Sequence, residues 1–170
     1  KTNLIIGQSG SGKTVLMKIC IGLFEPDSGN VSFDKRPFSN TKEKAKSDIR
    51  KEMGVLFQGG ALFDSMNVEQ NVMFPLNMFT DLSYEEKLER VNFCLNRVNL
   101  NGINNMMPSE LSGGMMKRVA IARAISNSPK YLFCDEPNSG LDPLTAELID
   151  ELISEITQEF NITTIVNTHD

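Results

Sequence analysis

A glycine-rich octapeptide near the start of the chain carries the clearest chemical signal. It reads Gly7-Gln8-Ser9-Gly10-Ser11-Gly12-Lys13-Thr14 and fits the pattern G-x-x-x-x-G-K-[ST]. In this pattern the glycines let successive main-chain N–H groups turn inward and bind phosphate oxygens. Lys13 would reach the β and γ phosphates, and the Thr14 hydroxyl would coordinate Mg²⁺. The octapeptide predicts a site for a nucleoside triphosphate.

Two adjacent carboxylates, Asp135 and Glu136, follow the apolar run 131–134. A carboxylate at the end of a parallel strand lies where ligands bind such sheets, so Asp135 could hold Mg²⁺ through its water shell. If the chain stays extended, Glu136 points to the opposite face. We therefore predict that Asp135 serves the metal and that Glu136 polarises the attacking water.

The single histidine, His169, follows a second apolar run, 163–166. Parallel strands end at a common edge, so this imidazole should emerge beside Asp135 and the octapeptide, where it could contact the γ phosphate. A single histidine considered by itself is more often structural. Only the presence of the octapeptide and of the two carboxylates favours a functional role for His169.

These side chains need a scaffold of alternating strands and helices. Apolar runs bounded by turn residues predict strands at 2–6, 31–33, 53–57, 131–134 and 163–166. Helical spacing predicts helices at 13–23, at 84–98 behind a capping box, from near Ser112, and from Pro143 to Phe160. Strands and helices alternate at both ends around a mostly helical middle. The pattern predicts a parallel α/β core with an inserted helical subdomain.

Composition sets the limits of this interpretation. The chain has 170 residues, 40% of them hydrophobic, with a net charge of −5, which excludes collagen-like, coiled-coil-only and disordered classes. No apolar run approaches the ~18 residues that span a bilayer. Lysines and arginines occur in short scattered groups, so no nucleic-acid partner is expected. The three cysteines, Cys20, Cys94 and Cys134, are interpreted as core thiols of a reducing compartment.

One further motif decides the family. Leu111-Ser112-Gly113-Gly114-Met115 precedes a helix and offers a hydroxyl and free N–H groups to an anion. In isolation it would usually be a simple helix cap. Because it follows Gln58 and precedes Asp135, the arrangement resembles the ATP-binding subunit of ABC transporters across nearly the whole chain.

The resemblance implies a role for each motif. Residues 7–14 would be Walker A, Gln58 the Q-loop and a ligand of Mg²⁺, 111–115 the signature and 131–136 Walker B. Ser139-Gly140-Leu141-Asp142 looks like the D-loop and His169 like the H-switch. The implied catalytic residues are Glu136, His169, Gln58 and Lys13, and the implied cofactors are ATP and Mg²⁺. Family members dimerise head to tail, so that Ser112, Gly113 and Gly114 of one copy, with Asp142, would close on ATP held by the other.

Within this family the chain looks most like the ATPase of Mla-type phospholipid transporters. The resemblance rests on Met115, where glutamine is usual, and on the segment Leu56-Phe57-Gln58-Gly59-Gly60-Ala61-Leu62-Phe63. It implies an ATPase that energises phospholipid transport from the cytoplasmic face of the inner membrane, with permease subunits and a lipid-binding MCE-type protein as partners. The apolar residues Ala61, Leu62, Phe63 and Met66 would either be buried under the helical subdomain or receive a cytoplasmic helix of the permease.

Two alternatives remain open at this stage. One is the ATPase of an importer for another small solute, such as an amino acid or a metal chelate. The other is a DNA-associated ABC ATPase, which the absence of sustained heptads and of a basic patch between Gln58 and Ser112 disfavours. Salt-sensitive DNA binding would support it.

The resemblance also suggests domain boundaries. We expect an ATPase core formed by residues 1–66 and 127–170, with the helical subdomain at 67–126. Family members carry an adenine-stacking aromatic residue before Walker A and further elements after the H-switch. The chain is therefore expected to be an ATPase domain truncated at both ends.

Overall fold

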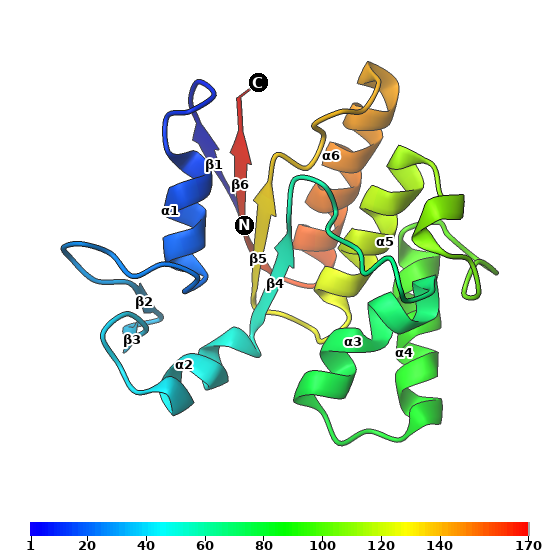
Figure 1. The fold of residues 1–170 in the computed structure, drawn as a ribbon, viewed down its shortest axis with the longest axis horizontal. Helices are drawn as coiled ribbons and strands as arrows, with labels where there is room; N and C mark the ends of the chain where they lie inside the picture. Colours follow the sequence, from blue (N-terminus) through cyan, green and yellow to red (C-terminus); the bar gives the residue numbers. More distant parts are fainter. Residues whose placement is uncertain (170) are drawn as a thin grey trace.

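A four-stranded parallel sheet forms the centre of the molecule, in a computed structural model that describes residues 1–169 (Figure 1). The strands are β1 (Thr2–Ile6), β4 (Met53–Leu56), β5 (Tyr131–Asp135) and β6 (Thr163–Thr168), in the order β1-β6-β5-β4. The register pairs Ile6 with Thr168 and Asp135 with Asn167. Because all four strands are parallel, their carboxyl ends meet at one edge of the sheet.

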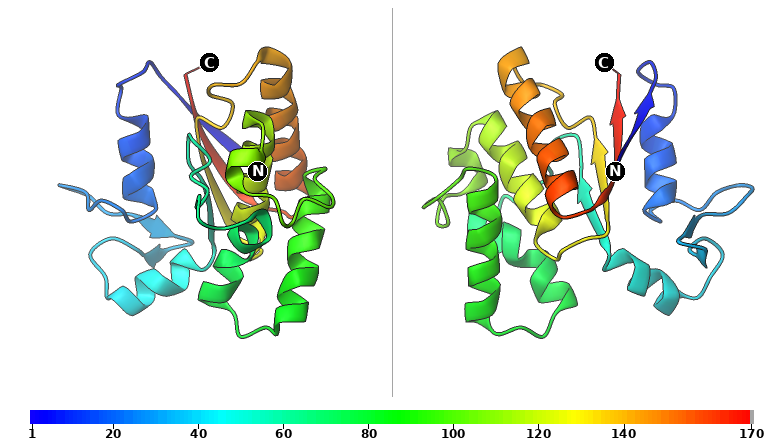
Figure 2. Two further views of the ribbon diagram at one scale, coloured as in Figure 1. Left: turned by 45° about the vertical axis from the view of Figure 1, so that its right-hand side comes forward. Right: turned by 180° about the vertical axis from the view of Figure 1, so that it is seen from behind.

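Helices cover both faces of this sheet (Figures 1 and 2). On one side lies α1 (Lys13–Cys20), and on the other lie α5 (Gly113–Ile125) and α6 (Pro143–Glu159). The residues of β5 are buried throughout, as a strand covered on both faces requires. This doubly covered parallel sheet confirms the predicted α/β class.

A small antiparallel hairpin extends beside the end of α1. It consists of β2 (Ser32–Phe33) and β3 (Arg36–Pro37), and α2 (Glu43–Arg50) follows it. The ring of Phe33 contacts Tyr131 and Phe133 of β5 edge-on, at centroid distances of 4.9 and 6.3 Å. Arg36 forms two hydrogen bonds to the Glu52 carboxylate, at 3.0 and 2.7 Å. These contacts fix the hairpin to the core.

The middle of the chain is helical, as predicted. It contains α3 (Val68–Phe79), α4 (Tyr84–Arg97), the short 3₁₀ helix η1 (Pro108–Glu110) and α5. Asn67 and Ser83 begin α3 and α4 with complete capping boxes. The helix α5 packs against α3 and α4 and also against β4 and α6. It thus contacts both the predicted helical subdomain and the predicted ATPase core. The boundaries of that subdomain at 67 and 126 stay a prediction.

The structure corrects several details of the sequence-based elements. The helix predicted at 13–23 ends at Cys20, because Gly22 turns the chain at a φ of 76°. Neither α2 nor α3 was predicted as a separate helix. Cys94 and Cys134 are buried as expected, whereas Cys20 is only half-buried.

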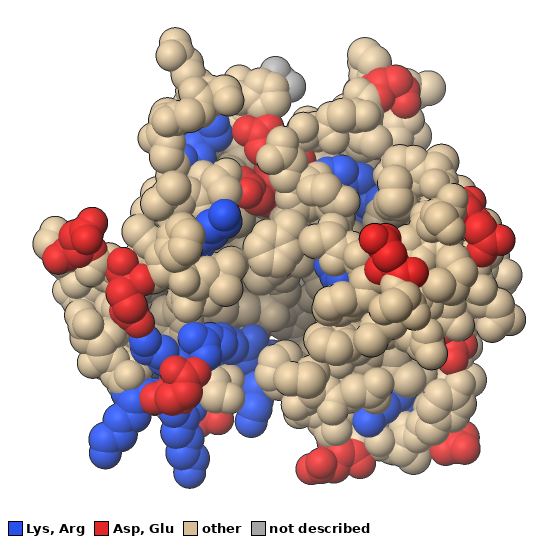
Figure 3. Space-filling model, in the orientation of Figure 1, with Lys and Arg blue, Asp and Glu red and all other residues tan. Residues whose placement is uncertain are grey.

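Lysine and arginine side chains gather over α2 and the hairpin, at the lower left of Figure 3, rather than being scattered. Many of these cations are neutralised locally by carboxylates. The ion pairs join Arg36 to Glu52, Lys46 to Glu25, Arg50 to Glu43 and Lys51 to Asp48. The patch is therefore mixed in charge.

Candidate functional site

The glycine-rich loop lies between β1 and α1, so its amides cap the N-terminus of a helix. Gly10 and Gly12 adopt left-handed conformations, with φ of 79° and 93°, which side chains other than glycine rarely tolerate. Lys13 begins α1 and folds back over the loop, where its Nζ donates to the main-chain oxygens of Gly7 at 2.6 Å and Gln8 at 3.1 Å. The loop has the form of a phosphate cradle.

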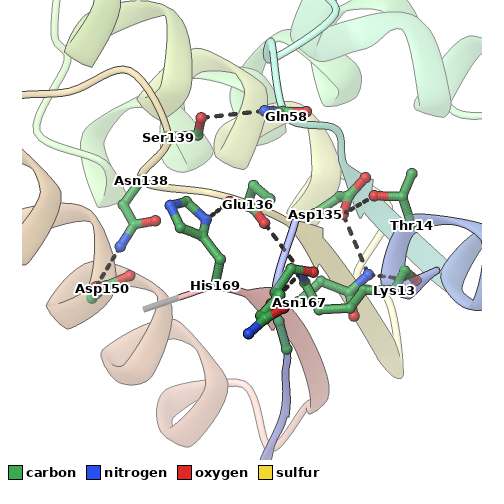
Figure 4. Close-up of polar contacts among 12 residues, drawn as sticks. Lys13, Thr14, Gln58, Asp135, Glu136, Asn138, Ser139, Asp150, Asn167 and His169 are labelled. Carbon is green, nitrogen blue, oxygen red and sulfur yellow. Dashed lines mark hydrogen bonds and ion pairs between the residues drawn. The ribbon is translucent and has the colours of Figure 1, made fainter. Parts of the chain in front are cut away.

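Asp135 lies next to Thr14 across the sheet edge (Figure 4). The Thr14 hydroxyl donates to Asp135 Oδ1 at 3.0 Å, although the two residues are 121 positions apart. Asp135 is 5% exposed. A hydroxyl and a carboxylate in contact are the hard oxygen ligands that Mg²⁺ takes from a protein when phosphates and water complete its coordination shell. These two residues fit the predicted magnesium site.

Glu136 turns toward the same cavity, which corrects the prediction that it points to the opposite face. The strand ends at Asp135, and Glu136 has a left-handed φ of 49°, so the alternation of an extended chain does not apply to it. Its Oε1 lies 3.8 Å from Lys13 Nζ, and its Oε2 contacts Nδ1 of His169. Figure 4 shows the three side chains converging.

These groups line one open cavity of about 330 Å³. Its walls come from the glycine-rich loop, the start of α1, the segment after β4, the segment after β5, and the end of β6. The lining residues are Ser9, Gly10, Gly12, Lys13, Thr14, Val15, Gln58, Glu136, Ser139 and His169. The three segments predicted to meet at one sheet edge, which are 7–14, 135–136 and His169, do meet there, and Gln58 lies beside them.

Gln58 stands at the rim of this cavity. Its side-chain Nε2 donates to Ser139 Oγ at 3.2 Å, above the pair formed by Asp135 and Thr14 (Figure 4). Its predicted role as a ligand of Mg²⁺ stays a prediction, because this side chain is bonded to another partner.

Ser112 and Asp142 lie outside the cavity lining and act as helix caps. The Ser112 hydroxyl accepts a hydrogen bond from Met115 N at 3.2 Å and begins α5. Asp142 begins α6 by accepting from Thr145 N at 3.0 Å, and hydrogen bonds from the side chain and then the backbone N–H of Thr145 lower the pKa of its carboxyl. Gly113, which is exposed, and Gly114, which is half-buried, form the first turn after Ser112. A second chain would be needed to bring this turn to a phosphate.

Three buried polar residues around the site were missed by sequence reasoning. Asn167 donates to Lys13 O at 2.9 Å and to Asp135 Oδ1 at 3.3 Å. Lys117 donates to the main-chain oxygen of Gln58, and Arg123 donates to Gly60 and Ala61. Polar residues inside an otherwise apolar strand or helix are the only sequence signal they give.

The fold and the cavity define a nucleotide-binding α/β domain, with a phosphate loop between a strand and a helix and two carboxylates at the end of another strand of the same sheet. A family model described as ABC transporter matches residues 1–139. The chain therefore belongs to the ABC transporter family, as one of its ATP-binding domains.

Comparisons with individual proteins agree. The chain is 41% identical, over its whole length, to the intermembrane phospholipid transport system ATP-binding protein MlaF of Escherichia coli K12, and it spans 63% of that protein. It is 39% identical over 99% of its length to mkl of Mycobacterium leprae, described as a probable ribonucleotide transport ATP-binding protein, and it spans 49% of it. It thus spans about half of mkl and just under two thirds of MlaF.

A solved structure shows the same fold. The dimeric, post-hydrolysis structure of the ATP-binding cassette MJ0796 with ADP and Pi superposes with a TM-score of 0.88 at 34% identity, covering 98% of this chain and 74% of that one. Among the described residues of the present chain, no helix is long and apolar enough to cross a membrane.

Proposed function

We propose that the chain binds ATP with Mg²⁺ and hydrolyses it to drive a membrane permease that moves phospholipid. The single observation that carries the ATPase part is the convergence of Lys13, Thr14, Glu136 and His169 on one cavity, with Asp135 hydrogen-bonded to Thr14 beside it. A phosphate cradle, a pair of oxygen ligands and a carboxylate base are the parts that phosphoryl transfer to water requires.

Each residue has a distinct task in this proposal. The loop amides and Lys13 bind the β and γ phosphates, while Thr14 and Asp135 hold Mg²⁺, which neutralises charge on the phosphates when bound. Glu136 accepts a proton from the attacking water. His169 contacts the Glu136 carboxylate and fixes its orientation.

The signature turn favours a head-to-tail dimer. The first turn of α5 exposes free N–H groups at a helix N-terminus, but it does not line the cavity of its own chain. Such a turn binds anions. A second copy of this chain would place its Ser112, Gly113 and Gly114 against the nucleotide, and the similar cassette MJ0796 is a dimer bound to ADP and Pi.

An apolar groove of about 410 Å³ supports a permease partner. It lies between β4 and α3, on the face that is hollowed in Figure 3, and includes Phe57, Phe63, Phe74, Met78 and Phe79. Phe63 and Met78 are 40% and 61% exposed. Ala61 and Phe63 line this groove, which favours docking of a permease helix over burial as their role. Binding there would hold the chain at the cytoplasmic face of the inner membrane.

The assignment of phospholipid rests on similarity to MlaF, and similarity to mkl supports a second candidate, the transport of another solute. Co-purification with the permease, followed by reconstitution in vesicles, distinguishes the two. Phospholipid exchange stimulated by ATP supports the first, whereas uptake of a small solute without lipid movement supports the second. An MCE-type partner would co-purify in the first case.

Substitution of the proposed base tests the ATPase. Glu136→Gln should keep ATP binding and reduce turnover by about 100-fold or more, because the amide cannot accept the proton. Glu147→Gln, an exposed substitution on α6, is the matched control. Phosphate release and binding of a fluorescent nucleotide are measured together. Turnover of Glu136→Gln equal to that of the control would refute the assignment.

A further inference from the structure

Lys117 is a buried cation on the helix that follows the signature turn. It is 5% exposed, although it lies only five positions after Ser112, the residue that caps α5. Burial lowers the pKa of its ammonium group, and the negative charges of the nearby Asp135 and Glu136 carboxylates oppose that shift. The side chain therefore crosses from the helical region toward the carboxylates of the ATP site.

The ammonium group of Lys117 is bonded to main-chain oxygens. Its Nζ donates to the carbonyl oxygen of Gln58 and lies 3.5 Å from the carbonyl oxygen of Glu136. Among the ion pairs of the described residues, none joins Lys117 to a carboxylate. The two carbonyls belong to two different segments, both of which line the ATP cavity.

Stability alone does not account for such a residue. Burying a cation without a paired carboxylate costs desolvation energy, a cost that an apolar side chain of similar length would not carry. The carbonyl oxygen of Glu136 has a second donor, Ser139 N at 3.1 Å. Removing the ammonium group would thus leave one main-chain oxygen, that of Gln58, without this partner.

Because Lys117 lies on α5, its hydrogen bonds link this helix to the segments of Gln58 and Glu136. A helix rises 1.5 Å per residue, so Lys117 lies about 7.5 Å along the axis from Ser112. Within this distance a helix moves as a rigid unit. Any displacement of the signature turn is therefore passed to the ammonium group, and from there to the segments that carry Gln58 and Glu136.

We propose that Lys117 is a positioning residue that couples movement of α5 to the placement of Gln58 and Glu136. The inference rests on the proposed ATPase function and adds a residue that does not touch nucleotide. When the signature turn binds phosphate, α5 moves and Lys117 moves with it. Its hydrogen bonds then place the main-chain carbonyls of Gln58 and Glu136, so that the Glu136 carboxylate lies against the attacking water.

The test uses the protein at its natural length, with Lys117→Met and Lys117→Arg. Lys117→Met should lower kcat by about 10- to 100-fold, the cost of a small misplacement of a catalytic group, while KM for ATP stays within about 2-fold. Lys117→Arg retains a cation of similar reach and should recover most of the turnover. Lys130→Met, at an exposed lysine beside β5, controls for loss of one positive charge.

Hydrogen–deuterium exchange provides the readout that a structural role would not change. In the wild-type protein, ATP should slow exchange in the segment 57–61, where Gly60 N–H is bonded to Phe57 O at 2.8 Å. In Lys117→Met this response to ATP should be lost, while the melting temperature without nucleotide stays within about 3 °C of wild type.

The outcomes are separable. Wild-type kcat with a wild-type exchange response in Lys117→Met would overturn the inference. So would a large drop in melting temperature in both variants, because it would make Lys117 a purely structural residue. Failure of the wild-type protein to hydrolyse ATP would instead count against the proposed function and leave no reaction for Lys117 to position.

Discussion

Asn167 and Lys13 are 154 positions apart, yet the side-chain amide of Asn167 donates a hydrogen bond of 2.9 Å to the main-chain oxygen of Lys13. The same amide lies 3.3 Å from Asp135 Oδ1, the oxygen that accepts the Thr14 hydroxyl. Asn167 is completely buried, and its own Oδ1 has no hydrogen-bond partner. The residue therefore joins the end of β6 to both the phosphate loop and the proposed magnesium ligand.

Removing this amide should weaken the proposed magnesium site. Asn167→Leu keeps the size of the side chain but frees Asp135 to rotate, so the Mg²⁺ concentration that half-saturates nucleotide binding should rise about 10-fold. Loss of the unpartnered oxygen offsets the loss of the hydrogen bonds, and stability should change little. Binding of a fluorescent nucleotide titrated with Mg²⁺ measures the effect. A shift of equal size in Asn77→Leu, at an exposed position of α3, would show that the effect is not local.

Gly54 lies where α5 packs against β4. A Cβ atom added at Gly54 would lie 2.2 Å from the main-chain oxygen of Ala124 and 3.2 Å from Leu132 Cδ1. Because backbone cannot move aside cheaply, Gly54→Ala should lower the free energy of unfolding by about 2 kcal/mol or more. Gly59→Ala, where a Cβ meets nothing within 4 Å, should stay within about 0.5 kcal/mol of wild type. Urea denaturation compares the two variants, and equal midpoints would contradict the predicted clash.

Glu52 makes stability depend on pH. Hydrogen bonds from Arg36, and then from Lys130, hold the pKa of its carboxyl below the ordinary value of 4.5. A lowered folded-state pKa contributes stability that is complete above pH 4.5 and is lost as the pH falls through the folded-state value. The melting temperature of wild type should therefore fall more steeply below pH 4.5 than that of Glu52→Gln. Parallel melting curves for the two proteins across this range would count against the ion pair.

The cysteines should differ in reactivity. Burial raises the pKa of Cys94 to about 11 and that of Cys134 to about 12, so both thiols stay protonated and shielded in the folded protein. Cys20 is half-buried, and burial raises its pKa less strongly. Iodoacetamide at pH 8 should modify Cys20 first, and the other two only after denaturation. Mass spectrometry of tryptic peptides measures the order, which early labelling of Cys94 would contradict.

Much of the fold could be predicted from local sequence patterns. The apolar run 131–134 is buried on both sides, and Ser83 with Glu86 begins α4 with the predicted capping box. These features depend on neighbouring residues alone, so they can be read without the tertiary structure. α2 could not be found in this way, because its residues Glu43–Arg50 are mostly charged and carry a weak apolar pattern.

In the candidate site, too, some features could be predicted from the sequence and others could not. The octapeptide 7–14, Asp135, Glu136 and His169 could be selected by residue type and order, because phosphate and magnesium demand particular donors at particular spacings. The direction of Glu136 could not, since a single left-handed φ of 49° at the end of β5 reverses the expected alternation.

The sequence by itself therefore determined the chemistry of this protein: a phosphate loop, two carboxylates, one histidine and a signature turn in the order of an ABC transporter ATP-binding domain. Only the tertiary structure decided which buried polar residues support that chemistry. Asn167 and Lys117 make their hydrogen bonds to atoms of Lys13, Gln58 and Glu136, which are distant in sequence. Most of these acceptors are main-chain oxygens. Every residue has such an oxygen, so the sequence of side-chain types cannot predict which ones will accept. Only the packing of β6 and α5 against the site brings donors and acceptors together.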